Sequence, residues 1–410
     1  MTRTDAGNGV AERVRQARKL KGWTQERLAQ EVAAAVGKEA RVSLSLIRGV
    51  ERGAVQASPT FLSAVSKTLG TSVPELLGQP YAHTSTEDSE VATGIAVIRR
   101  ELAAYDLPNS ITPRPIELIT ADVDQLRGYR RATNFRKLSA ALPAVLPEAR
   151  ALAHSSKGRT RELAFGLLCD LYSASWSLAH KLGYADLATI AVERLSWAAN
   201  LSGDQLWIAA AQFQRASVLT SVGDWDAAQT YLDVCRAALD VKTDDRRSLV
   251  SWGGLHLQSG LAAARAGDRQ TSDAHLAEAR ETVARIGDNE FQDPVLVFGH
   301  SNVGIWSVGL AVEMLDGVEA IRRAGQMQIV PGTPRSRVGH LYIDLGRAYL
   351  LNGDRKRTLE SLQQAREIAP SQTRYHPMVH ETVRVLARRE ARSTESLRGF
   401  AAWCGVTSLD

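Results

Sequence analysis

Cysteine is scarce in this sequence, and the patterns that would give it a special role are missing. Cys169, Cys235 and Cys404 lie far apart and form no CxxC pair. Such spacing predicts small core or surface residues in a reducing compartment and argues against a disulfide framework. His376 and His380 are four residues apart, but Pro377 intervenes and no third ligand is near, so we expect no metal site.

Membrane segments and catalytic motifs are also absent. No run of 18 uncharged apolar residues occurs, which argues against a transmembrane helix. The first residues, MTRTDAGNGVAERV, lack the apolar core of a signal peptide, so we expect a cytoplasmic protein. No GxxxxGK[ST], GxGxxG, GxSxG or HExxH motif is present. We therefore expect a protein that is not an enzyme and needs no cofactor.

The excess of positive charge is confined to one end of a chain whose length suits two or three domains. The net charge is +5, and residues 1–80 contain twelve Lys and Arg against seven Asp and Glu. Residues 81–410 contain equal numbers of each. A basic first fifth is typical of polyanion binding, although a solvated basic face produces the same pattern.

Helical spacing and capping residues predict five short helices in residues 1–80. The signals are Val10, Val14 and Ala17 for the first helix, Thr24 as cap of the second, Ser43 of the third, Ser58-Pro59 for the fourth and Pro74 for the fifth. Gly53 is expected to close the third helix. Between the second and third helices, QEVAAAVGKEARV (30–42) is long enough for the second helix to continue to Gly37.

Several stretches of this region resemble the DNA-binding domain of phage Cro and repressor proteins, the XRE family. The stretches are Arg18, WTQERLA (23–29), S…IRGVERG (43–53), SP (58–59) and LGTSVPELL (69–77). In that family an arginine seven residues before the helix-2 glutamine pairs with a glutamate near the end of helix 3. The resemblance implies that Arg18 and Glu51 form a structural ion pair, with Gln25 as the glutamine.

The resemblance also implies which residues face DNA. The start of the helix after Ser43 enters the major groove, where Arg48 donates to guanine and Leu44 contacts a thymine methyl group. Alternatively, Arg48 is a solvated surface residue and Leu44 belongs to the core. Gln25 is expected at a phosphate, and the long turn brings further cations within reach of phosphates. The predicted DNA-binding residues are Gln25, Lys38, Arg41, Ser43, Leu44, Ser45, Arg48, Gly49 and Arg52.

Composition divides the rest of the chain. GQPYAHTSTEDSE (78–90) is polar, and LPNSITPRP (107–115) holds three prolines, so we expect a linker and irregular segment at 81–115. Residues 116–395 are predicted to be helical, and 396–410 to be a tail.

Turn signals recur through the helical region. Glycines 183, 223, 267, 309 and 353 each follow one apolar helix and precede another, at spacings of 40, 44, 42 and 44 residues. A period of this length predicts an array of antiparallel helix pairs, preceded by an irregular pair around 118–156. The last pair, with Gly346, Tyr349 and Gly353, resembles a tetratricopeptide repeat. The expected fold is therefore all-α: a five-helix head followed by a tetratricopeptide-like α-solenoid.

Three further stretches of the body are FGHSNVGIW (298–306), SRVGHLYIDLGRAY (336–349) and APSQTRYHPMVHETVRVLARR (369–389). With these stretches, head and body together resemble a large group of actinobacterial regulators. Such arrays form a concave surface suited to peptides or small ligands. Positions counted back from the turn glycines of tetratricopeptide helices, and residues close to them, supply candidates for an effector, with ordinary groove-wall or inter-repeat contacts as the alternative for each. The candidate effector-binding residues are Asp170, His180, Asn302, Trp306, His340 and Arg347.

We therefore expect a transcriptional regulator that binds double-stranded DNA as a homodimer and senses a peptide or small-molecule effector. The alternative is a helical-repeat scaffold for protein partners that has no effector ligand.

Overall fold

The computed structural model confirms an all-α fold. It describes residues 9–37, 41–81, 86–107, 109–239, 245–287, 291–292, 296–389 and 395–406. Within these residues the chain forms 21 helices and one two-stranded antiparallel sheet, which pairs Phe291 with Phe298. The three cysteines are buried and unpaired. No helix in these ranges is long and apolar enough to span a membrane.

Five helices form the N-terminal head, as predicted. They are α1 (Val10–Leu20), α2 (Gln25–Val36), α3 (Leu44–Glu51), α4 (Pro59–Leu69) and α5 (Val73–Leu77). The hydroxyl groups of Thr24, Ser43 and Ser58 each accept a hydrogen bond from the backbone N–H three residues further on, which caps the helix that follows. α2 continues to Gly37, as expected. α5 begins one residue before Pro74, because Ser72 and Glu75 form a capping box.

The segment expected to be irregular contains a long helix. α6 (Thr86–Ala103) occupies most of 81–115 and packs against α8. Val91, Ile95, Ile98 and Leu102 are buried at this contact and recur at intervals of three or four residues, as on one face of a helix. The polar residues before this stripe caused the wrong prediction, because they outweighed the apolar spacing that follows them.

Paired helices form the body. The bounds are α7 (Ile116–Arg131), α8 (Phe135–Ser155), α9 (Gly158–Leu182), α10 (Ala185–Ser202), α11 (Gln205–Ser221), α12 (Trp225–Ala237), α13 (Arg246–Ala266), α14 (Arg269–Ile286), β1 (Phe291–Gln292), β2 (Val297–Phe298), α15 (His300–Glu313), α16 (Gly317–Gly325), α17 (Arg335–Leu351), α18 (Arg355–Ile368), α19 (Pro370–Tyr375), α20 (Pro377–Arg389) and α21 (Glu395–Cys404). Four of the five predicted turn glycines do separate paired helices and have positive φ, which glycine adopts without steric cost.

The fifth turn lies elsewhere. Gly309 is inside α15, and the chain turns at Leu315 (φ 58) before Asp316 caps α16 through its side chain. A cap-forming aspartate thus marks this turn, whereas Gly309 has a packing role: a Cβ there would lie 3.0 Å from a carboxylate oxygen of Asp344. Groove positions counted back from Gly309 are therefore in the wrong register.

The predicted tail also contributes to the core. Leu397, Phe400 and Ala401 of α21 are buried in one cluster with Val379 and Val383 of α20. The helical body therefore extends past residue 395.

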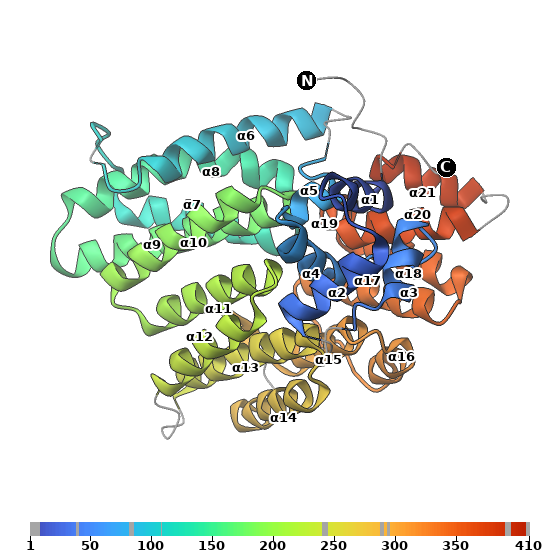
Figure 1. Ribbon diagram of the computed structural model, residues 1–410. Helices are drawn as coiled ribbons and strands as arrows, with labels where there is room; N and C mark the ends of the chain where they lie inside the picture. Colours follow the sequence, from blue (N-terminus) through green and yellow to red (C-terminus); the bar gives the residue numbers. More distant parts are fainter. Residues whose placement is uncertain are drawn as a thin grey trace.

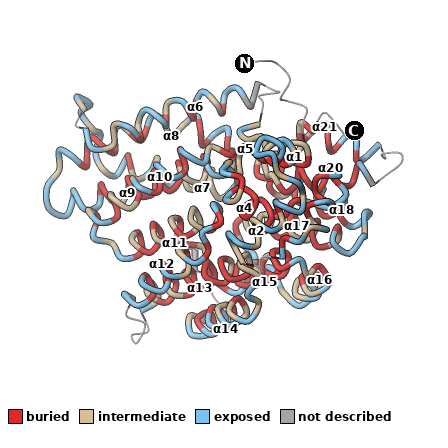
Figure 2. Tube along the Cα trace, viewed as in Figure 1, coloured by how far each residue is buried: buried red, intermediate tan, exposed pale blue. Residues whose placement is uncertain are grey.

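The head is docked against the body (Figure 1). Trp225 from α12 and Met378 from α20 belong to the apolar core of the head. Ser63 donates to the carbonyl oxygen of Ser221 at 3.0 Å, and Gln56 donates to Thr382 Oγ1 at 2.8 Å. α4 is buried on nearly its whole circumference as a result (Figure 2).

Candidate functional site

The Arg18–Glu51 pair predicted from the sequence is present. Arg18 Nε lies 2.6 Å from Glu51 Oε1, and Arg18 Nη2 donates to Glu51 Oε2 at 2.8 Å. Burial by itself would raise the pKa of Glu51, but hydrogen bonds from Arg18 and Gln25 hold it below its ordinary value. Arg15 also donates to the backbone carbonyl of Glu51. The network ties α1 and α2 to the end of α3.

Polar and basic side chains lie on the opposite face of α3. Ile47, Val50 and Glu51 point into the head, so helical geometry leaves Ser45, Arg48 and Arg52 exposed on the other side. Ser43 is exposed at the N-terminus of the helix, and Leu44 is partly exposed. Arg48 pairs with Glu26 on α2, and both side chains are about half exposed. This face is open to a partner.

Three predicted DNA-binding residues differ from this set. Gly49 is buried, and a Cβ there would lie 2.8 Å from the Val55 side chain, so the structure does not place it on the open face. Gln25 donates from its amide to Glu51 Oε2 at 2.7 Å, which occupies part of the group expected at a phosphate. Lys38 lies outside the described residues. Contact of Gln25 with DNA stays a prediction.

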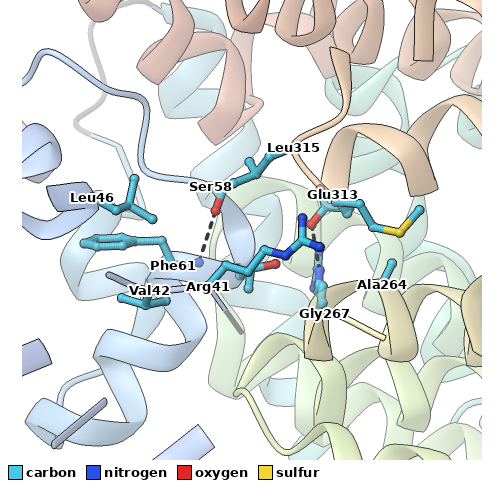
Figure 3. Close-up of a pocket in the computed structure, with 12 residues that line it drawn as sticks. Arg41, Val42, Leu46, Ser58, Phe61, Ala264, Gly267, Glu313 and Leu315 are labelled. Carbon is cyan, nitrogen blue, oxygen red and sulfur yellow. Dashed lines mark hydrogen bonds and ion pairs between the residues drawn. The ribbon is translucent and has the colours of Figure 1, made fainter. Parts of the chain in front are cut away.

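Arg41 is exposed but faces the body. It lines a small pocket between head and body together with Leu46, Phe61, Glu313 and others, and its side chain extends toward Glu313 (Figure 3). Its backbone has φ 56, an uncommon conformation for a residue other than glycine. The body therefore approaches the same flank of the head from which a phosphate contact by Arg41 was predicted.

A larger cavity separates α3 from the body. It has a volume of about 180 Å³ and is lined on the head side by Leu46, Val55, Gln56 and Ser58, and on the body side chiefly by aliphatic residues and Arg347. Arg347 is buried and pairs with Glu313 at 2.9 Å and Asp344 at 3.0 Å. Its guanidinium group is thus held in an internal ion network. Because this paired guanidinium group also lines the cavity, effector binding by Arg347 stays a prediction.

The other candidate effector residues fall into separate groups. Asp170 is buried and pairs with Arg127 and Arg130 of α7. Asn302 is buried and donates to the Val297 carbonyl oxygen, and Trp306 contacts Phe213 edge to face. These two lie on α15, where the turn was misplaced. The six residues do not form one site.

His180 and His340 are the pair that the fold brings to one region. His180 stacks on Trp176 at 5.3 Å, and His340 meets His376, the residue after α19, at 5.5 Å between ring centroids. Lys181, Arg337 and His376 lie in the same region and were missed by sequence reasoning. The sequence did contain one signal, which is helical spacing from a candidate residue. Arg337, for example, lies three residues before His340.

Comparison with known proteins identifies the fold of the head. Residues 14–76 match the HTH_3 family model, described as Helix-turn-helix. A search of curated proteins found no match. Among solved structures, the chain is similar to PlcR of Bacillus thuringiensis in complex with the peptide PapR7 and DNA, with 12% identity, 67% of this chain and 94% of that chain covered, and a TM-score of 0.26. Such a remote likeness carries no functional argument. The chain is therefore a helix-turn-helix domain followed by a helical-repeat body.

Proposed function

We propose that the protein is a transcriptional regulator that reads double-stranded DNA with the open face of α3. The observation that carries the proposal is the exposed row of Ser45, Arg48 and Arg52 within a helix-turn-helix domain. The second helix of such a unit lies in the major groove, where arginine donates two hydrogen bonds to guanine. Ser43 and Leu44 are positioned at the end of the helix that would enter first.

The proposal includes a homodimer and an effector. Helix-turn-helix dimers read two half-sites about 34 Å apart, which matches the two-fold symmetry of the protein to that of the site. A body of paired helices provides the surface for dimerisation and ligand binding. These parts of the proposal rest on the architecture and on the position of the head against the body.

Selection of bound sequences from random duplex DNA with the full chain tests the proposal. We expect one enriched motif, built as a palindrome, whose affinity falls steeply with salt because bound phosphates release counterions. Arg48→Ala should relax specificity at one base position and cost about 1–3 kcal/mol of binding.

The matched control is Arg100→Ala, which removes an equally exposed arginine from α6 in the body and should leave binding unchanged. Light scattering of the free and DNA-bound protein reports the dimer. No enriched motif, or equal losses for both variants, would favour a protein-interaction scaffold.

A further inference from the structure

Cationic and imidazole side chains from three helices and the residue after a fourth meet in the body, away from the open face of α3. We call them the cationic cluster; its members are Arg130 of α7, His180 and Lys181 of α9, Arg337 and His340 of α17, and His376, which directly follows α19. Sequence separations reach more than 200 residues, so only the tertiary fold brings these groups together.

Contacts within the body fix the position of the cluster. α19 packs against both α9 and α17. Lys181 Nζ donates to Gln372 Oε1 at 2.5 Å, and Gln372 Nε2 donates to the carbonyl oxygen of Ser336 at 2.9 Å. Gln372 therefore links the end of α9 to the start of α17. His376 directly follows α19, and its ring meets that of His340 on α17.

Arg130 of the cluster is paired with an acid, whereas two other cations, Lys181 and Arg337, are not. Among the described residues, no carboxylate lies within ion-pair distance of Lys181 or Arg337. Asp170 is engaged by Arg127 and Arg130 on α7. Burial, with Arg337 and Arg130 nearby, lowers the pKa of Lys181 to about 7. Burial likewise lowers the pKa of Arg337, with Arg130 adding to the effect.

The pKa values of the histidines are lowered as well. Desolvation by the surrounding helices and the neighbouring Lys181 lower the pKa of both His180, whose side chain is exposed, and His340, which is partly exposed. When several groups that can carry positive charge are held close together, each one destabilises the charged form of the next. An anion placed among them reverses the sign of this interaction and gains charge-assisted hydrogen bonds.

Aromatic rings and an unused donor border the cluster. Trp176 stacks on His180, and its indole N–H is buried and has no hydrogen-bond partner in the structure. A buried donor without a partner is costly, so a ligand that accepts a hydrogen bond from this indole would be stabilised by it. Lys181 also lies 5.7 Å from the Phe135 ring centroid. The surroundings thus suit an anion that carries an apolar or planar part.

We infer that the cationic cluster binds a small ligand with two or more negative charges, carried by phosphate or carboxylate groups. That this ligand is the effector of the regulator rests on the proposed function. That the cluster binds an anion rests on the contacts of the cluster alone. Arg337 supplies positive charge, Lys181 is held in its protonated form by a bound anion, and the three imidazoles and the Trp176 indole supply directed donors.

Calorimetric titration of the full chain with tripolyphosphate and, separately, with citrate tests the inference. We expect saturable binding of at least one probe and a higher unfolding temperature than in sodium chloride of equal ionic strength. Preference for tripolyphosphate identifies a phosphorylated ligand, and preference for citrate a polycarboxylate. Absence of binding by both probes overturns the inference.

Lys181→Gln and Arg337→Gln should each weaken binding about tenfold, as expected for the loss of one close charge. Lys356→Gln is the matched control, because it removes the same charge from α18, where the Lys356 side chain is 87% exposed. Gln372→Glu places a carboxylate beside Lys181 with little change of shape and should abolish binding while the protein stays folded. Equal losses for Lys356→Gln and Lys181→Gln would show non-specific charge attraction and overturn the site.

The DNA selection is scored separately. Anion binding without DNA binding removes the proposed regulator and leaves the site intact. DNA binding without anion binding removes the site and leaves the regulator intact.

Discussion

Arg48 and Glu51 lie three residues apart on α3, yet their environments are opposite. Glu51 has a side chain only 1% exposed and accepts hydrogen bonds from Arg18 and Gln25. Arg48 is about half exposed and pairs with Glu26 across the surface. The difference follows from the phase of the helix, which turns Glu51 toward α1 and Arg48 away from it.

Substitution at these two positions should separate stability from DNA reading. Glu51→Ala leaves Arg18 buried without its partner and should lower the free energy of unfolding by roughly 3–5 kcal/mol. Arg48→Ala should change it by less than about 1 kcal/mol, as expected for a surface pair. Urea denaturation measures both. Similar losses would mean that the two roles are wrongly assigned.

Asp344 gives a pH dependence of opposite sign to that of most carboxylates. Burial raises its pKa to about 6; Arg347 opposes this rise and Glu313 adds to it. The folded protein therefore keeps a proton that the unfolded chain releases near its ordinary pKa of 3.8. This contribution to stability is complete below pH 3.8 and is lost as the pH rises through about 6.

The unaltered protein should therefore lose stability as the pH rises from about 4 to 7. Asp344→Asn should not show this loss. At pH 8 the variant should be more stable by up to roughly 3 kcal/mol, since one pKa unit corresponds to about 1.4 kcal/mol. Denaturation across this pH range checks the difference between the two proteins. Glu360→Gln, an exposed residue of α18, is the control. Parallel stability curves for Asp344→Asn and the unaltered protein would contradict the assignment.

At the scale of elements, α4 is the helix that joins head to body. A helix that packs on one side buries a stripe, but eight of the eleven α4 residues are buried. Phe61, Leu62 and Val65 belong to the core of the head. Ser63 meets the turn after α11, where a Cβ on Gly223 would lie 3.0 Å from the Ser63 carbonyl oxygen. Small groups on both sides allow this close approach.

A large charged side chain at Ser63 should separate head from body. Ser63→Arg forces a guanidinium group into a site that is 2% exposed, whereas Thr68→Arg adds the same group at a partly exposed position of the same helix. We expect Ser63→Arg to increase the radius of gyration and to speed hydrogen exchange in α12 while helical content is retained. Thr68→Arg should do neither. If Ser63→Arg changes neither the radius of gyration nor hydrogen exchange, the docked contact does not hold the head in solution.

Over the whole molecule, consecutive helices connect the cationic cluster with the head. Gln372 of α19 accepts a hydrogen bond from Lys181 of the cluster, and the cluster member His376 is the one residue between α19 and α20. On α20, Met378 and Thr382 accept hydrogen bonds from Gln56 of the head, and the Arg388 side chain lies against Gly53. A ligand that shifts α19 therefore acts on the surface that holds the head.

Anion and DNA should consequently change each other's affinity by the same factor, since coupling between two sites is reciprocal. Gln56→Ala removes two hydrogen bonds to α20 and should reduce this factor without weakening anion binding. Gln125→Ala, on the exposed side of α7, is the control. Titration of each ligand in the presence of the other measures the coupling. Affinities that are independent in the unaltered protein would rule out this route.

Local signals in the sequence were enough to predict the head and most turns. Caps, apolar periodicity and positive-φ glycines act within about four residues, so Thr24, Ser43 and Gly183 could be read directly. The Arg18–Glu51 pair was predicted because a family motif records that tertiary contact. α6 was missed although the apolar spacing from Val91 to Leu102 was visible, because the polar residues before it were given more weight.

Contacts between distant repeats were decided only by the tertiary structure. Small rotations between helix pairs add up along the body, and their sum determines that Lys181 meets Gln372 and that Ser63 meets Ser221. No local pattern contains that sum. For the same reason the sequence indicated His180 and His340 separately, while their meeting with Lys181, Arg337 and His376 in one unbalanced cluster depends on how the whole superhelix closes.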